Sequence, residues 1–180
     1  MITEANVAVL FIDVQDKLLP AIDQSNHLVE SLKVSLKAFS ALNLPIVVTE
    51  QYPKGLGSTI GELKGLLAPN VKAYDKISFS ALKDSNIKEK ILSLKKDYWI
   101  VVGIEAHICV LQSVTDLCNF DKNVIIIDEC VGSRRSMHKK IALDEMRKKN
   151  VRITCTESLI FELLGNANHS KFKEISALIR

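Results

Sequence analysis

The hexapeptide VAVLFI (Val7–Ile12), which Asp13 follows directly, decides the fold class of this chain. The run is short, rich in β-branched residues and apolar throughout, which is typical of a strand buried on both faces of a parallel sheet. Comparable runs recur at 45–49 (PIVVT), 71–74, 98–102 (YWIVV), 123–127 (NVIII) and 151–154. Together they predict a mostly parallel sheet of six strands.

Segments with apolar residues at helical spacing separate these runs. They lie at 23–42, 87–94, 108–120, 137–149, 159–164 and 171–179, with Asp23 or Ser25 as the candidate N-cap of the first. Alternating strands and helices predict right-handed βαβ units in a three-layer α/β/α sandwich with a Rossmann-like sheet. The stretch QYPKGLG (51–57) predicts a loop. Since no repeat or linker interrupts the pattern, we expect residues 1–180 to form a single domain.

Composition excludes several classes of function. The 180 residues include 24 Lys plus Arg against 21 Asp plus Glu, a net charge of +3, so we expect no nucleic acid and no membrane as a partner. The opening MITEANVAVLFID has no basic n-region, and no apolar run approaches the roughly 18 residues of a membrane span. The four cysteines contain no C-x-x-C pair. We therefore expect a cytoplasmic protein with free thiols.

Three reactive side chains follow predicted strands, where ligands bind in open parallel sheets. Asp13 follows the first strand, Lys76 the third, and Cys109 ends the segment GIEAHIC after the fourth. Each has a simpler interpretation as well: Asp13 as a turn cap, Lys76 as a surface lysine, and Cys109 as a small packed side chain. An acid, an amine and a thiol at one sheet edge predict nucleophilic chemistry.

Cys109 lies near the start of a predicted helix, where backbone amides and the helix dipole favour an anion. This position predicts a lowered thiol pKa and a thiolate near neutral pH, which Lys76 would favour further. Asp13 could orient Lys76 and exchange a proton, while backbone amides hold an oxyanion. We expect the other cysteines to be packed, although the role of Cys130 stays open because it also follows a strand.

Three motifs resemble the isochorismatase-like cysteine hydrolases: LFIDVQ (10–15), KISFSAL (76–82) and GIEAHICV (103–110). The stretches TEQYPKGLG (49–57) and TESLIFELLGNANHSKFKEI (156–175) resemble the compact subgroup of isochorismatase domain-containing proteins, so the resemblance covers nearly the whole chain. It implies that Asp13 is the general acid/base, that Lys76 is its partner and that Cys109 is the nucleophile.

The resemblance also implies the surroundings of these residues. A non-proline cis peptide bond is expected between Ile104 and Glu105, in the turn that holds the oxyanion. The residues implied to line the substrate pocket are Gln15, Tyr52, Phe79 and His107. A homo-oligomer is implied as well, through the apolar face of the 137–149 helix or through the C-terminal helices, and some members of the subgroup are mitochondrial.

Two departures narrow the implied chemistry. Nicotinamidases in the superfamily hold zinc through an Asp-x-His pair and a further His, whereas this chain has Gln51, Tyr52 and Pro53 there and no histidine between His27 and His107. We therefore expect no catalytic metal and no cofactor. True isochorismatases cleave a vinyl ether without a cysteine nucleophile. A small-molecule amide or related C–N bond, hydrolysed through an acyl-enzyme thioester, therefore fits this chain better.

Two other functions remain open. The protein could be a catalytically retired or weakly active binding or scaffold protein on the same fold. It could also be a thiol-based redox protein that uses Cys109 together with Cys118 or Cys130. The residue types at 51–60 and 76–84, which surround the expected pocket, do not identify a substrate.

Overall fold

The computed structural model describes residues 2–179 and contains a six-stranded sheet in the order β3-β2-β1-β4-β5-β6. Every neighbouring pair of strands is parallel, which confirms the predicted Rossmann-like sheet. The strands are β1 (Val7–Ile12), β2 (Ile46–Gln51), β3 (Ala73–Lys76), β4 (Tyr98–Ile104), β5 (Asn123–Gly132) and β6 (Arg152–Thr154).

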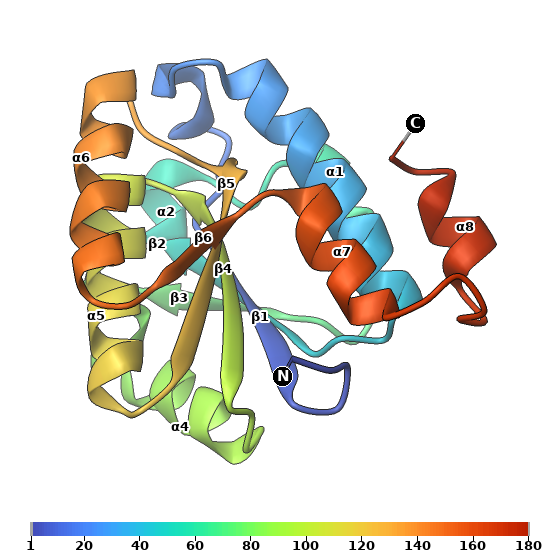
Figure 1. Cartoon of the computed structure of the whole chain (residues 1–180). Helices are drawn as coiled ribbons and strands as arrows, with labels where there is room; N and C mark the ends of the chain where they lie inside the picture. Colours follow the sequence, from blue (N-terminus) through green and yellow to red (C-terminus); the bar gives the residue numbers. More distant parts are fainter. Residues whose placement is uncertain (1, 180) are drawn as a thin grey trace.

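Helices cover both faces of the sheet (Figure 1). One layer consists of α1 (Ser25–Ala41), α7 (Thr156–Leu164) and α8 (Phe172–Ser176), and the other of α4 (Ser85–Ser93), α5 (Leu111–Asn119) and α6 (Ser136–Lys148). Alternate residues of β1 enter the two cores, with Phe11 on the α1 side and Leu10 on the α5 side. This double burial explains why β1 is apolar without interruption.

Five short elements complete the chain. They are η1 (Leu19–Ala21), α2 (Pro53–Leu56), α3 (Gly61–Lys64), η2 (Ala81–Lys83) and η3 (Ala106–Val110). The predicted loop at 51–57 is therefore partly wrong. Gln51 is the last residue of β2, and Pro53 opens a helical turn because its fixed φ suits the first position of a helix.

Other predicted boundaries also move. Asp75 and Lys76 lie within β3 instead of after it, and β5 continues past Cys130 because a register shift opposite Val101 and Gly103 lets its pairing with β4 resume. The predicted helix at 108–120 divides into a π-helical turn, η3, and the α-helix α5. Neither candidate N-cap of α1 is correct, since Gln24 occupies that position and its side chain makes no capping bond.

Gly103 allows β4 to approach β1 closely where the two strands end. Its φ is +120°, and a Cβ there would lie 2.1 Å from the carbonyl oxygen of Ile12. Only glycine tolerates both the backbone conformation and this approach. The turn that carries Cys109 is thereby held beside the end of β1. In residues 2–179, no helix has both the length and the apolar character needed to cross a membrane.

Candidate active site

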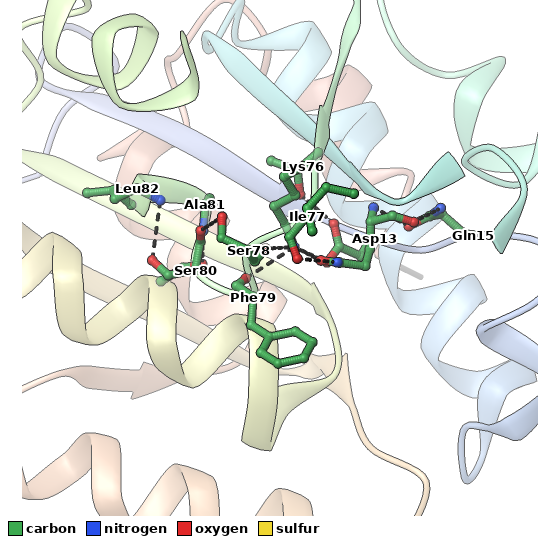
Figure 2. A network of polar contacts seen from close by, with 12 residues as sticks. Asp13, Gln15, Lys76, Ile77, Ser78, Phe79, Ser80, Ala81 and Leu82 are labelled. Atoms are coloured by element: carbon green, nitrogen blue, oxygen red, sulfur yellow. Dashed lines mark hydrogen bonds and ion pairs between the residues drawn. The ribbon is translucent and has the colours of Figure 1, made fainter. Parts of the chain in front are cut away.

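A buried ion pair joins the ends of β1 and β3. Asp13 directly follows β1 with a left-handed φ of 53°, and its N–H donates to the carbonyl of Thr49 at 3.1 Å. Lys76 is the last residue of β3, two strands away. Its Nζ lies 2.7 Å from Oδ2 of Asp13, and both side chains are 0% exposed. The interpretation of Lys76 as a surface lysine is therefore wrong, and Figure 2 shows its side chain directed toward Asp13.

Further hydrogen bonds satisfy both members of this pair. Thr49 donates its hydroxyl to Oδ1 of Asp13 at 2.7 Å. The Lys76 ammonium donates to Oε1 of Gln51 at 2.6 Å, to the carbonyl of Phe79 at 3.1 Å and to that of Ser78 at 3.3 Å. Charges removed from water persist only when they are paired and hydrogen-bonded, and this pair meets both conditions.

Cys109 is the third member of the group. It lies in η3 and is only 7% exposed, and its thiol interacts with the side chains of both Asp13 and Lys76. Burial, followed by the Asp13 carboxylate, raises the pKa of Cys109 to about 12, although Lys76 acts in the opposite direction. The predicted lowering of this pKa is wrong because burial outweighs the helix start. The resting thiol is protonated, with a carboxylate beside it that can accept the proton.

The turn before Cys109 has the expected backbone form. The Ile104–Glu105 peptide bond is cis. The carbonyl of Glu105 accepts hydrogen bonds from the N–H groups of Ile108 at 3.0 Å and Val110 at 3.2 Å, which closes the π-helical turn. The Glu105 side chain binds Nε of Arg134 at 2.9 Å. The carbonyl of Glu105 is therefore tied into the β4–α5 connection, and its side chain is tied to the β5–α6 connection.

Gln15 is buried, and its amide links β1 to the segment after β2. Its Nε2 donates to the carbonyls of Gln51 at 3.0 Å and Gly57 at 2.6 Å, and its Oε1 accepts from the N–H of Gln51 at 2.7 Å. Both amide protons are used in these bonds. Gln15 therefore fixes the shape of the 51–57 segment. This structural role was not predicted from the sequence, which indicated only a substrate contact.

The other residues predicted to line the pocket lie on three different connections, after β2, β3 and β4. Tyr52 and Phe79 are both exposed, on the segments that follow β2 and β3, and Figure 2 shows the ring of Phe79 directed away from Lys76. His107 is half-buried, and its Nδ1 lies 3.0 Å from Oγ of Ser133 after β5. The structure brings together Asp13, Lys76 and Cys109. Substrate contact by the remaining residues stays a prediction.

Thr49 and Gln51 are site residues that the sequence patterns did not single out. Thr49 pairs in register with Ile12, and Gln51 pairs with Lys76. The signal that could have found them is a polar residue on the strand between two reactive side chains. This signal can be recognised only when the strand order β3-β2-β1 is known. In that order β2 lies between the strand that ends at Lys76 and the strand that Asp13 follows.

The other three cysteines differ in environment. Cys130 is buried, 3.2 Å from Oγ of Ser35, and burial raises its pKa to about 12. Cys118 is partly buried. Cys155 is exposed, so the prediction that all three are packed is wrong for this residue, which precedes the first turn of α7. Across residues 2–179, no cluster of three or more His, Cys, Asp or Glu side chains has an arrangement that could hold a metal ion.

Comparison with known proteins supports a family assignment. The isochorismatase domain model matches residues 7–158. The secreted isochorismatase effector Isc1 of Phytophthora sojae is 35% identical over 96% of this chain and 84% of its own. Isochorismatase domain-containing protein 2 of Danio rerio is 34% identical over 94% of this chain and 85% of its own. These matches agree with the subgroup that the sequence resembles.

Solved structures give the same result for the fold. A Caenorhabditis elegans protein described as MAR1 ribonuclease is 35% identical, with a TM-score of 0.93, over 99% of this chain and 91% of its own. The YcaC gene product of Escherichia coli, described as an octameric hydrolase of unknown specificity, also has a TM-score of 0.93, over 99% of this chain and 88% of its own. At 17% identity the second likeness concerns the fold alone.

Proposed function

Because the chain belongs to the isochorismatase family, we propose that it is a cysteine-dependent hydrolase of a small-molecule amide or related C–N bond. The observation that carries the proposal is the solvent-free ion pair of Asp13 and Lys76, both of which act on the thiol of Cys109. A pair of charges costs several kcal/mol per ion to bury, and charges kept beside a nucleophile are typical of catalytic sites.

The first half of the reaction transfers an acyl group to sulfur. Asp13 accepts the thiol proton as Sγ of Cys109 attacks the substrate carbonyl. Because the pKa of the thiol is high, the proton is transferred during the attack and not before it. The carbonyl π electrons move to oxygen, and backbone amides near Glu105 and Cys109 hold this oxyanion. When the intermediate collapses, the C–N bond breaks and Asp13 returns the proton to the leaving amine. A thioester remains on Cys109.

The second half releases the acid. Water loses a proton to Asp13 and attacks the thioester carbonyl, and the C–S bond then breaks. The thiolate takes the proton back from Asp13, which restores the resting state. Lys76, whose Nζ lies 2.7 Å from Oδ2 of Asp13 in the resting structure, holds the Asp13 carboxyl group in position for both proton transfers. Gln15, Tyr52, Phe79 and His107 are proposed to shape the substrate pocket.

Cleavage of RNA is the second candidate function. One structure with 35% identity over nearly the whole chain is described as a ribonuclease. The observation that favours this candidate is a cleft lined by four basic side chains, namely His107, Arg134, Arg135 and His138. Against it, the chain has a net charge of only +3. A retired binding or scaffold protein is the third possibility.

Activity measurements on variants test the proposal. Purified protein is assayed for release of amine or ammonia from a set of amides, ureido acids and carbamoyl compounds, with single-stranded RNA as a separate substrate. We expect Cys109→Ala and Asp13→Asn to lose on the order of 10³-fold or more of the turnover of any amide cleaved. Cys155→Ala, at the exposed cysteine, is the matched control. RNA cleavage without amide cleavage, or no turnover, contradicts the proposal.

The proposal includes a homo-oligomer that acts in the cytoplasm. The outer face of α6 supports the first part, because Met137 and Ile141 lie one helical turn apart there and are 60% and 57% exposed. The cytoplasmic location is tested by cell fractionation with an antibody to this protein, because the related Phytophthora protein is named as secreted.

A further inference from the structure

A cleft lined by basic side chains lies between η3 and α6. Its volume is about 340 Å³, and its lining residues are His107, Arg134, Arg135 and His138. In the part of the chain that the structure describes, no carboxylate-bearing residue lines this cleft. A concave surface of one sign of charge favours an oxyanion. These residues form what we call the basic cleft.

Arg134 is held in place from one side. Its Nε donates to Oε2 of Glu105 at 2.9 Å, and the described residues offer no hydrogen bond to its terminal nitrogens. A guanidinium presents several N–H donors in one plane, which matches the oxygens of a carboxylate or phosphate. Glu105 therefore orients Arg134 and leaves part of its donor set for a ligand.

The two histidines face each other in the basic cleft. Their ring centroids are 4.8 Å apart, and Nδ1 of His107 lies 3.0 Å from Oγ of Ser133. Burial lowers the pKa of His107, Glu105 raises it, and the neighbouring His138 and Arg134 lower it further. An anion in the cleft would favour the protonated form of His107, as the Glu105 carboxylate does.

The start of α6 adds to this attraction. His138 lies in the first turn of this helix, Arg135 is its N-cap residue, and the first turn contains no acidic side chain. The N-terminus of a helix carries a partial positive charge and outward N–H groups. Here that end lies beside the four basic side chains of the cleft, of which Arg134 is paired with the Glu105 carboxylate.

We propose that the basic cleft binds an oxyanion group, phosphate or carboxylate. His107, which lines the cleft, lies two residues before Cys109 in η3. Residues two apart on a helical turn face different directions. The basic cleft is therefore a binding site separate from the thiol of Cys109.

Calorimetric titration of the full chain with inorganic phosphate, and separately with acetate, tests this site. We expect the Arg135→Gln/His138→Gln protein to bind the preferred anion on the order of tenfold more weakly than wild type. Arg147→Gln, at the other end of α6, is the matched control and keeps wild-type affinity. Arg135→Lys, which preserves the charge, retains more affinity than Arg135→Gln. Equal thermal unfolding midpoints exclude misfolding as the cause.

Three results would overturn the inference. They are no binding of either anion, equal binding by wild type and Arg135→Gln/His138→Gln, and binding of a single-stranded RNA oligonucleotide that phosphate fails to displace. The stronger binder of phosphate and acetate identifies the anionic group. Titration of Cys109→Ala separates the two proposals, since anion binding there supports the basic cleft even if no amide is ever hydrolysed by the wild type.

Discussion

The ammonium of Lys76 lies 2.7 Å from the carboxylate of Asp13, across one intervening strand, and neither side chain is exposed to solvent. Thr49 and Gln51, both on that intervening strand, form further hydrogen bonds with the two members of the pair. The pair stands beside a protonated thiol, so the resting site holds a base and a nucleophile that has not yet lost its proton.

Lys76→Met is expected to lower the free energy of unfolding by about 3–5 kcal/mol, because it leaves the Asp13 carboxylate buried without a partner. Chemical denaturation monitored by circular dichroism measures the loss. Lys83→Met is the control, since the exposed Lys83 lies 3.8 Å from Asp116 and such pairs contribute about 1 kcal/mol or less. If Lys76→Met costs no more than Lys83→Met, the pair is not the buried ion pair described here.

Cys109 is expected to react slowly with iodoacetamide at neutral pH, and more slowly than the exposed Cys155. A pKa of about 12 means that the reactive thiolate increases roughly tenfold with each pH unit up to that value. Peptide mass spectrometry at a series of pH values follows both cysteines. Asp13→Asn removes a charge that raises this pKa and should speed labelling. A labelling rate of Cys109 that levels off near neutral pH would contradict this picture.

Thr49→Val is expected to reduce turnover of a cleaved amide and to lower the free energy of unfolding by about 1.5–3 kcal/mol. The valine removes the donor to Oδ1 of Asp13 while keeping the shape of the side chain. Thr49→Ser keeps a hydroxyl and should restore most of the activity, which a purely steric role would not predict. Equal turnover by the valine and serine variants would show that the hydrogen bond has no part in positioning Asp13.

Met137→Glu/Ile141→Glu is expected to dissociate the proposed homo-oligomer. Both side chains are largely exposed on one face of α6, and charged residues there would oppose apolar association. Size-exclusion chromatography with light scattering gives the mass of each protein. Lys148→Glu, exposed at the end of the same helix, is the control and should keep the wild-type mass. An unchanged mass in the double variant would assign the interface to another face.

The sequence pattern was sufficient for the sheet and for three members of the site, Asp13, Lys76 and Cys109. Uninterrupted apolar runs such as 7–12 and 98–102 predicted parallel strands because burial on both faces leaves no polar position. Asp13 and Cys109 could be found because each directly follows a strand or the turn after it. Lys76 was found as well, although the structure places it at the end of β3 and not after it.

The pKa of the thiol and the contacts of the charged groups could not be predicted from the order of residues alone, because they depend on packing and strand register. The pKa of Cys109 rises because of the packing around η3 and the charge of Asp13, whereas its position in the sequence indicated only a helix start. Thr49, Gln51 and His138 likewise acquire their roles through strand register and helix placement. The helical turn at 53–56 was missed because its proline and glycine are typical of loops.

Intact-mass spectrometry of the protein during turnover of a cleaved amide tests whether the reaction passes through an acyl group on Cys109. We expect a covalent adduct with the mass of the acyl group, located at Cys109 by peptide mapping, absent from Cys109→Ala and unaffected by Cys155→Ala. Turnover of the amide by Cys109→Ala at the wild-type rate, with no acyl adduct on the wild-type protein, would contradict it.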